Sequence, residues 1–282
     1  MGGVEFIGVF KVKSKNAKVV YTAVFGDYDQ VPPVNPSWDC DFVCFTDHPN
    51  IVPAGWKVVF VQLNGEAPSQ ANRRYKILPH EYLKEYDFSL YVDANIRLVN
   101  DPSPLFNKYL EYGVLALPMH PIRNCIYDEA IACIEQGRAD KESTSELIKR
   151  YREDGFPEKF GLTENGVLFR KHHDKIVISL MNAWWEAYVN GVKRDQLSLP
   201  YLFWKNGVKF VELLEGPRVC RKYFEIELHN HEKNNSFIRR YVMLSIIRKD
   251  VSFSYWLIAY FASLVFAIKN IIRKGCGCQS AK

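Results

Sequence analysis

The segment that most constrains the fold is Tyr86–Leu98, YDFSLYVDANIRL, in which strand-forming residues run directly into Asp93-Ala94-Asn95. In an α/β sheet, polar residues that follow buried strands form the binding site at the carboxyl edge. If the segment stays extended, Asp93 and Asn95 lie on one face and can reach one cation or one hydroxylated ligand. The alternative is an ordinary turn, because Asp and Asn are common turn residues.

Composition predicts one large domain, or one domain with an appendage. The chain has 282 residues, of which 48% are hydrophobic and 14% aromatic, enough for a sizeable core. Its net charge is only +5, and no block of Lys and Arg with interleaved aromatic residues is present, so nucleic acid is not an expected partner. The seven cysteines are scattered, without a paired C-x-x-C, which argues against a zinc site or a disulfide framework and favours the reducing cytosol.

Apolar strand-like segments alternate with helical segments over the first ~120 residues, which predicts an α/β fold with a mostly parallel central sheet flanked by helices. The expected strands are Val19–Phe25, Asp41–Phe45, Trp56–Val61, the strand before Asp93, and Gly113–Pro118. Gly161–Lys171 is expected to be a loop followed by a strand, and later strands are expected at Val208–Leu214 and Phe224–Leu228. The expected helices include Ile176–Asn190 and Ser69–Tyr86, in which Pro79 must kink the helix or end a turn of it. Neither G-x-G-x-x-G nor a P-loop follows the first strand, so no dinucleotide or NTPase motif is supported.

The C-terminal stretch Val251–Ile268 contains no charged residue, which predicts a hydrophobic helix. Eighteen residues rise about 27 Å in a helix, which is marginal for spanning a bilayer. Basic residues flank the stretch, and these favour anionic lipid headgroups. We therefore expect residues 1–235 to form the main domain and residues 236–282 to associate with a membrane, by surface insertion or a single span. A helix buried in the domain or in a dimer is the alternative.

Several long motifs resemble a glycosyltransferase-like domain family found in plant mucilage-biosynthesis and turgor-regulation proteins and in bacterial polysaccharide loci. The resemblance covers residues from about 18 to 235. Its motifs are YTAVFGDYD (Tyr21–Asp29), DFVCFTD (Asp41–Asp47), RRYKILPHEYLKEYDFSLYVDANI (Arg73–Ile96), HPIRNCIYDEA (His120–Ala130), GLTENGVLFRKH (Gly161–His172) and RDQLSLPY (Arg194–Tyr201).

The resemblance implies a GT-A-like, Rossmann-type fold with a D-x-D-type metal motif. Transfer from a nucleotide-diphosphate sugar requires neutralisation of the leaving diphosphate, which a divalent cation held by carboxylates and phosphates can provide. Asp93 matches the first acidic position, whereas Asn95 replaces the second and brings no charge. A late histidine is a further expected metal ligand. His229 and His231 both qualify, because they share a face if their segment is extended.

Residues for the nucleotide sugar are also implied. The loop after the first strand and the end of the second would hold the base and ribose, through Phe25, Gly26, Asp29, Thr46 and Asp47. Arg73, Arg74 and Lys76 would contact the diphosphate, since Arg offers a bidentate fork and Lys a point charge. The alternatives are turn caps for the two aspartates and a solvated helix face for the basic residues.

The expected catalytic residues are Asp195 and Gln196, which resemble a D-Q element beneath the anomeric carbon. Asp195 would act as a base for the acceptor hydroxyl, or would stabilise an oxocarbenium-like state. The alternative is a helix N-cap. The residues expected on the sugar or acceptor side are His120, Arg123, Glu129, Glu164, Asn165 and Arg194.

Together these features predict a membrane-associated hexosyltransferase-like glycosyltransferase. It would use a nucleotide-diphosphate sugar, UDP-linked, with Mn²⁺ or Mg²⁺, and act on a polysaccharide or lipid-linked acceptor at the cytoplasmic side of a membrane. Two rivals are a non-catalytic carbohydrate-binding or scaffold protein on the same fold, which the uncharged Asn95 favours, and a nucleotidyltransferase. The absence of a Gly-rich activating loop argues against the second rival.

Overall fold

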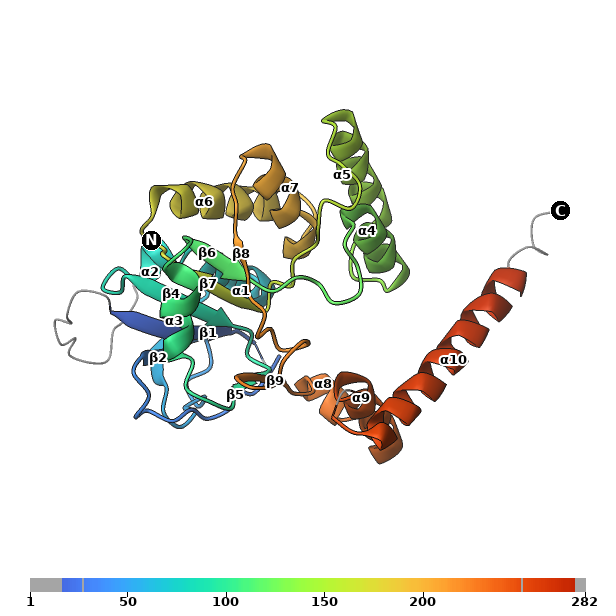
Figure 1. Cartoon of the computed structure of the whole chain (residues 1–282), viewed down its shortest axis with the longest axis horizontal. Helices are drawn as coiled ribbons and strands as arrows, with labels where there is room; N and C mark the ends of the chain where they lie inside the picture. The colour runs from blue at the N-terminus through green and yellow to red at the C-terminus, as the bar shows by residue number, and fades with distance from the viewer. Residues whose placement is uncertain (1–16, 27, 250, 277–282) are drawn as a thin grey trace. The chain divides into compact units, whose positions relative to one another are not determined.

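The computed structural model describes residues 17–26, 28–249 and 251–276. The chain divides into two compact units, residues 1–225 and 226–282, and Figure 1 traces both along the chain. The boundary expected after residue 235 lies inside the second unit.

The first unit is built on a sheet of seven strands in the order β3-β2-β1-β4-β7-β6-β8. Strands β1 to β4 pair in parallel, β7 runs antiparallel between β4 and β6, and β8 is parallel to β6. The expected mostly parallel sheet flanked by helices is confirmed. The strands are β1 (Lys18–Val24), β2 (Asp41–Thr46), β3 (Lys57–Phe60), β4 (Phe88–Val92), β6 (Leu115–Leu117), β7 (Val167–Arg170) and β8 (Val211–Glu212); β5 (Ile96–Leu98) pairs with β9 (Phe224–Ile226) in a second sheet.

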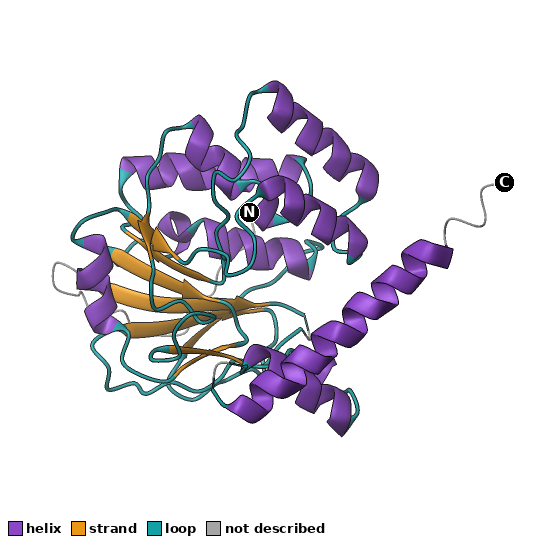
Figure 2. Ribbon diagram, turned by 45° about the vertical axis from the view of Figure 1, so that its right-hand side comes forward, coloured by secondary structure: helices purple, strands orange, loops and turns teal. Residues whose placement is uncertain are grey.

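The main core lies between one face of the sheet and two helices, α1 (Pro68–Ile77) and α6 (Lys175–Asn190). Side chains alternate along a strand, so Leu168 of β7 joins this core, whereas Phe169 points to the opposite face. There Phe169 packs 5.1 Å, between ring centroids, from Phe106 of α3 (Ser103–Leu110). Figure 2 shows most helices gathered on one side of the sheet.

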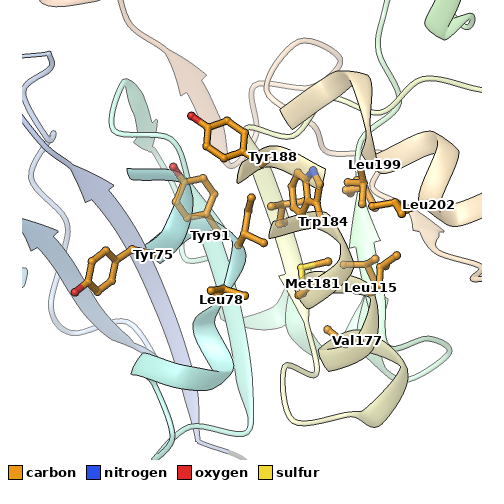
Figure 3. Close-up of a cluster of buried hydrophobic side chains, with 14 of the residues drawn as sticks. Tyr75, Leu78, Tyr91, Leu115, Val177, Met181, Trp184, Tyr188, Leu199 and Leu202 are labelled. Atoms are coloured by element: carbon orange, nitrogen blue, oxygen red, sulfur yellow. The ribbon is translucent and has the colours of Figure 1, made fainter. Parts of the chain in front are cut away.

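Helix α6 fills the centre of the core. In Figure 3 its Val177, Met181 and Trp184 lie beside Leu115 of β6 and Leu199 of α7 (Leu199–Lys205). Trp184 is fully buried, and a buried Trp contributes a large apolar area. The packing fixes α6, and with it the chain that follows.

The remaining helices of the first unit are α2 (Pro79–Tyr82), α4 (Ile126–Glu135), α5 (Lys141–Glu153) and a 3-10 turn at Asp195–Leu197. The expected helix Ser69–Tyr86 is two helices, because α1 ends before Pro79 and α2 begins with it. A proline has no N–H for the helix and fits best in a first turn.

The second unit contains α8 (Asn230–Lys233), α9 (Phe237–Ile247) and α10 (Phe253–Cys276). Helices α9 and α10 pack together, with the rings of Tyr241 and Tyr255 6.0 Å apart. Within the residues that the structure describes, no helix has both the length and the apolar character needed to cross a membrane.

Candidate active site

The turn after β4 presents Asp93. The backbone is not extended there, because Ile96 N donates to Asp93 O at 2.9 Å and closes a turn. The argument that Asp93 and Asn95 share an extended face is therefore wrong; the ordinary turn is what forms. The Asp93 side chain is 38% exposed, whereas Asn95 is buried. Tyr91 donates from its hydroxyl to Asp93 Oδ1 at 2.9 Å.

Helix α1 brings two cations to this turn. Lys76 Nζ lies 3.5 Å from Asp93 Oδ1 and 3.0 Å from Asp195 Oδ2, and Arg73 Nε lies 3.4 Å from Asp195 Oδ2. Arg73 and Lys76 are three residues apart, so they share a helix face. Arg74 does not, and pairs with Glu66 instead. Of the three basic residues expected at the diphosphate, the structure thus groups only Arg73 and Lys76 with Asp93.

Asp195 begins the 3-10 turn that follows α6 and is buried. The Trp184 indole donates to the Asp195 carbonyl at 2.9 Å, so the core helix α6 fixes the position of this residue. Burial alone would raise the pKa of Asp195, but the charges of Arg73, Lys76 and Arg194 outweigh it and hold the pKa well below its usual range. Asp195 is therefore an anion at neutral pH.

The loop after β1 and the end of β2 lie side by side, because the two strands are parallel neighbours. Asp47 accepts a hydrogen bond from Gly26 N at 2.9 Å, and Gly26 has a φ of +64°, which glycine adopts without strain. The side chains of Phe25, Thr46 and Asp29 are buried. Phe25 stacks on Tyr75 at 5.4 Å between centroids. Asp27 of the same loop lies outside the described residues.

The segment before β7 reaches Asp93 through its backbone, since Asp93 N donates to Gly166 O at 2.9 Å. Buried Asn165 accepts from the Thr163 hydroxyl at 2.9 Å, and Gln196 donates to the Thr163 carbonyl at 3.1 Å. Glu164 pairs with Arg218, and burial raises its pKa. The backbone on either side of Glu164 and Asn165, at Thr163 and Gly166, thus contacts Gln196 and Asp93.

A further group follows β6. His120 Nδ1 accepts from Arg123 N at 3.0 Å, and Arg123 Nε donates to buried Glu129 at 2.5 Å. Burial and the Arg123 charge lower the pKa of His120, so this imidazole is neutral at pH 7. Arg194 adds its charge beside Asp195. Each of these four expected residues, His120, Arg123, Glu129 and Arg194, therefore has a side-chain or electrostatic partner.

The late histidines belong to the second unit. The expectation that their segment is extended is wrong, because Asn230–Lys233 forms the short helix α8 and His229 is its N-cap, in a capping box with Glu232. The rings of His229 and His231 stack at 5.6 Å.

Positive charge exceeds negative charge around Asp93 and Asp195. Asp195 faces three cations, Arg73, Lys76 and Arg194, and Lys76 also lies beside Asp93. Among the residues that the structure describes, no three His, Cys, Asp or Glu side chains gather where they could hold a metal ion. The arrangement suits an anionic ligand, and a hard cation could bind where that ligand supplies most of the oxygen atoms.

Three contributors to the site were missed by sequence reasoning. Tyr91 donates a hydrogen bond to Asp93, and Trp184 donates one to the Asp195 carbonyl. Tyr188 is the third: burial raises its pKa, and the charges of Arg73 and Asp195 also act on that pKa. In Figure 3 the hydroxyl ends of Tyr91 and Tyr188 point away from the apolar cluster. Tyr91 could have been found, since it lies in the strand that runs into Asp93 and only two residues before it.

The solved structures that align with this chain include two glycosyltransferases with low sequence identity. The apo structure of mouse xyloside xylosyltransferase 1 aligns with a TM-score of 0.43 and 10% identity, covering 71% of this chain and 85% of that chain. The apo structure of the bifunctional glycosyltransferase WbbM aligns with a TM-score of 0.45 and 10% identity, covering 82% of this chain and 45% of that chain. TM-scores below 0.5 assign neither a substrate nor a mechanism. No curated protein matches the sequence.

A family match covers most of the first unit. The family described as "TOD1/MUCI70, glycosyltransferase-like domain" matches residues 43–231, which is more than half of the chain. The matched region contains Arg73, Lys76, Asp93 and Asp195. The chain therefore belongs to the TOD1/MUCI70 glycosyltransferase-like domain family.

Proposed function

We propose that this protein transfers a sugar from a nucleotide-diphosphate donor, UDP-linked, to a polysaccharide or lipid-linked acceptor. The observation that carries the proposal is the group formed by Asp93, Arg73, Lys76 and Asp195, in which excess positive charge lies beside a partly exposed carboxylate. In the reaction the bond between the anomeric carbon and the diphosphate oxygen breaks, the acceptor oxygen bonds to that carbon, and the proton of the acceptor hydroxyl passes to the departing diphosphate. Arg73 and Lys76 offset the charge of the leaving diphosphate.

Asp195 is proposed to stabilise the positive charge that develops on the sugar. Its depressed pKa makes it a weak proton acceptor, which favours this electrostatic role over general-base catalysis. The side from which the acceptor attacks decides whether the anomeric configuration is retained or inverted. The proton NMR spectrum of the product shows which configuration forms.

Mn²⁺ or Mg²⁺ is proposed to bind with the donor. Asp93 offers a hard, partly exposed carboxylate, and donor phosphates would supply further oxygen atoms, as is usual for Mg²⁺. Asn95, His229 and His231 stay proposed ligands. When bound, the ion would add positive charge against the leaving diphosphate.

The experiment is hydrolysis and transfer with a panel of nucleotide sugars, with and without Mn²⁺. We expect turnover of one donor, and a loss of about 100-fold in Asp93→Ala, typical for removal of one electrostatic group at a reacting centre. Asp128→Ala is the matched control, because Asp128 is an exposed carboxylate on α4. If calorimetry detects no binding of any nucleotide sugar, the proposal is wrong. Glycan binding without turnover would instead support the non-catalytic rival.

The second unit is proposed to bind the cytoplasmic surface of a membrane. Large apolar side chains of α9 and α10 are exposed, including Phe237, Ile238, Phe253, Trp256, Tyr260 and Phe261. Large exposed apolar surface marks an interaction site. Arg239 and Arg240 are exposed on α9, and such basic residues attract anionic headgroups. Five of the cysteines that the structure describes are free thiols, in keeping with a reducing compartment: Cys40, Cys44, Cys125, Cys133 and Cys220.

A further inference from the structure

Lys76 lies at the centre of the proposed donor site but is closed off from solvent. Its side chain is only 3% exposed, and its ammonium lies 3.0 Å from Asp195 and 3.5 Å from Asp93. It also lies 5.2 Å from the centre of the Tyr91 ring. One buried cation is therefore shared by two carboxylates from distant segments of the chain.

Two side chains from the sheet hold the backbone of Lys76 by hydrogen bonds. Its carbonyl, in the last turn of α1, accepts hydrogen bonds from the Tyr21 hydroxyl at 2.9 Å and from Arg170 Nη1 at 3.0 Å. Both donors are fully buried. Carbonyls in the last turn of a helix have no partner within the helix, so these bonds satisfy one of them and fix where the ammonium can reach.

The ammonium opposes a second cation at Asp93. Asp93 Oδ1 already receives the Tyr91 hydroxyl and faces Lys76. A divalent ion on this carboxylate would lie within a few ångström of the ammonium, and the two like charges repel because solvent screens the buried ammonium poorly. Donor phosphates bring negative charge that offsets this repulsion and also supply ligand oxygen atoms.

We propose that Lys76 is a positioning residue that acts as the resident counter-cation of the site. It holds Asp195 in place and keeps Asp93 from binding a free divalent ion, so that the ion enters only together with a nucleotide diphosphate. This role rests on the donor site proposed above. It differs from direct contact with the diphosphate, because the buried ammonium is already committed to two carboxylates.

The test measures Mn²⁺ binding by the paramagnetic resonance signal of free Mn²⁺, using the full-length chain with and without UDP. In the wild type we expect UDP to tighten Mn²⁺ binding at least ten-fold. Lys76→Met should bind Mn²⁺ alone at least ten-fold more tightly than the wild type, and the gain should disappear when Asp93→Ala is added. Lys76→Arg keeps the charge and should behave as the wild type. Lys149→Met, an exposed lysine on α5, is the control.

Unchanged Mn²⁺ affinity in folded Lys76→Met overturns the role of Lys76. If that variant does not fold, the wild type decides: Mn²⁺ binding that is equally tight with and without UDP also overturns it. Failure of the proposed function is separate, because it is read from nucleotide-sugar binding and turnover by the wild type and not from the affinity of Mn²⁺ alone.

Discussion

The charge state and burial of a single side chain in this protein depend more on its neighbours than on its residue type. Asp195 and Asp128 are both aspartates, yet one is buried among three cations and the other is exposed on a helix. Removal of one partner from a buried ion pair costs about 3–5 kcal/mol, because the other charge is left without compensation. The site is therefore coupled to the stability of the first unit.

His172 gives a residue-scale prediction on pH. It is fully buried beside the Leu83 carbonyl, and burial lowers its pKa to about 3. The unfolded chain takes up a proton near pH 6.5 and the folded chain does not. The contribution of His172 is therefore full above pH 6.5 and decreases as the pH falls toward 3. Between pH 7 and pH 5 we expect it to lower the free energy of unfolding by about 2 kcal/mol.

Urea unfolding at both pH values measures this effect. His172→Gln should show a shallower pH dependence than the wild type by that amount. His173→Gln, at an exposed neighbour, should keep the wild-type dependence. Equal pH dependence in wild type and His172→Gln would contradict the prediction.

At the scale of elements, α6 connects the hydrophobic core to the site. Its N-cap is Asp174, whose side chain accepts from Ile176 N at 2.8 Å, and in its second half Trp184 donates to the Asp195 carbonyl. The helix also shows how local signals set its bounds: an Asp cap begins it and Gly191 follows its last residue.

Asp174→Ala should destabilise the protein by about 1 kcal/mol, because one N-terminal amide of α6 loses its acceptor. Asp174→Ser restores a capping oxygen and should recover most of the loss. Thermal or urea unfolding of the three proteins checks this. An equal loss in both variants would show that the carboxylate acts otherwise than as a cap.

At the scale of the whole molecule, the second unit carries the surface proposed for membranes. The full-length chain should bind vesicles of phosphatidylcholine with phosphatidylserine more tightly than vesicles of phosphatidylcholine alone. The double variant Arg239→Gln, Arg240→Gln should lose about 2 kcal/mol of binding to the anionic vesicles, at about 1 kcal/mol for each charge. Vesicle sedimentation measures this.

The matched control is Lys149→Gln with Arg150→Gln, which removes two exposed charges from α5 in the first unit. It should bind as the wild type. If the full-length chain binds neither kind of vesicle and forms a stable dimer, a second copy of the chain covers the apolar surface instead.

The sequence determined the fold class and the elements, because these depend on local periodicity. Alternating strands and helices predicted the mostly parallel sheet, and Asp174 and Gly191 mark helix ends that any reader of the chain can see. The long motifs also identified the family from the sequence alone.

Only the tertiary structure decided how the site is put together. Lys76, Asp93 and Asp195 meet because α1, the turn after β4 and the turn after α6 are packed on one core, and no spacing along the chain reports that. Local pattern left Asp93-Ala94-Asn95 open between an extended segment and the turn that forms. It misjudged His229–His231, where a helix begins. Short polar segments have little periodicity, so hydrogen bonds and packing choose their backbone.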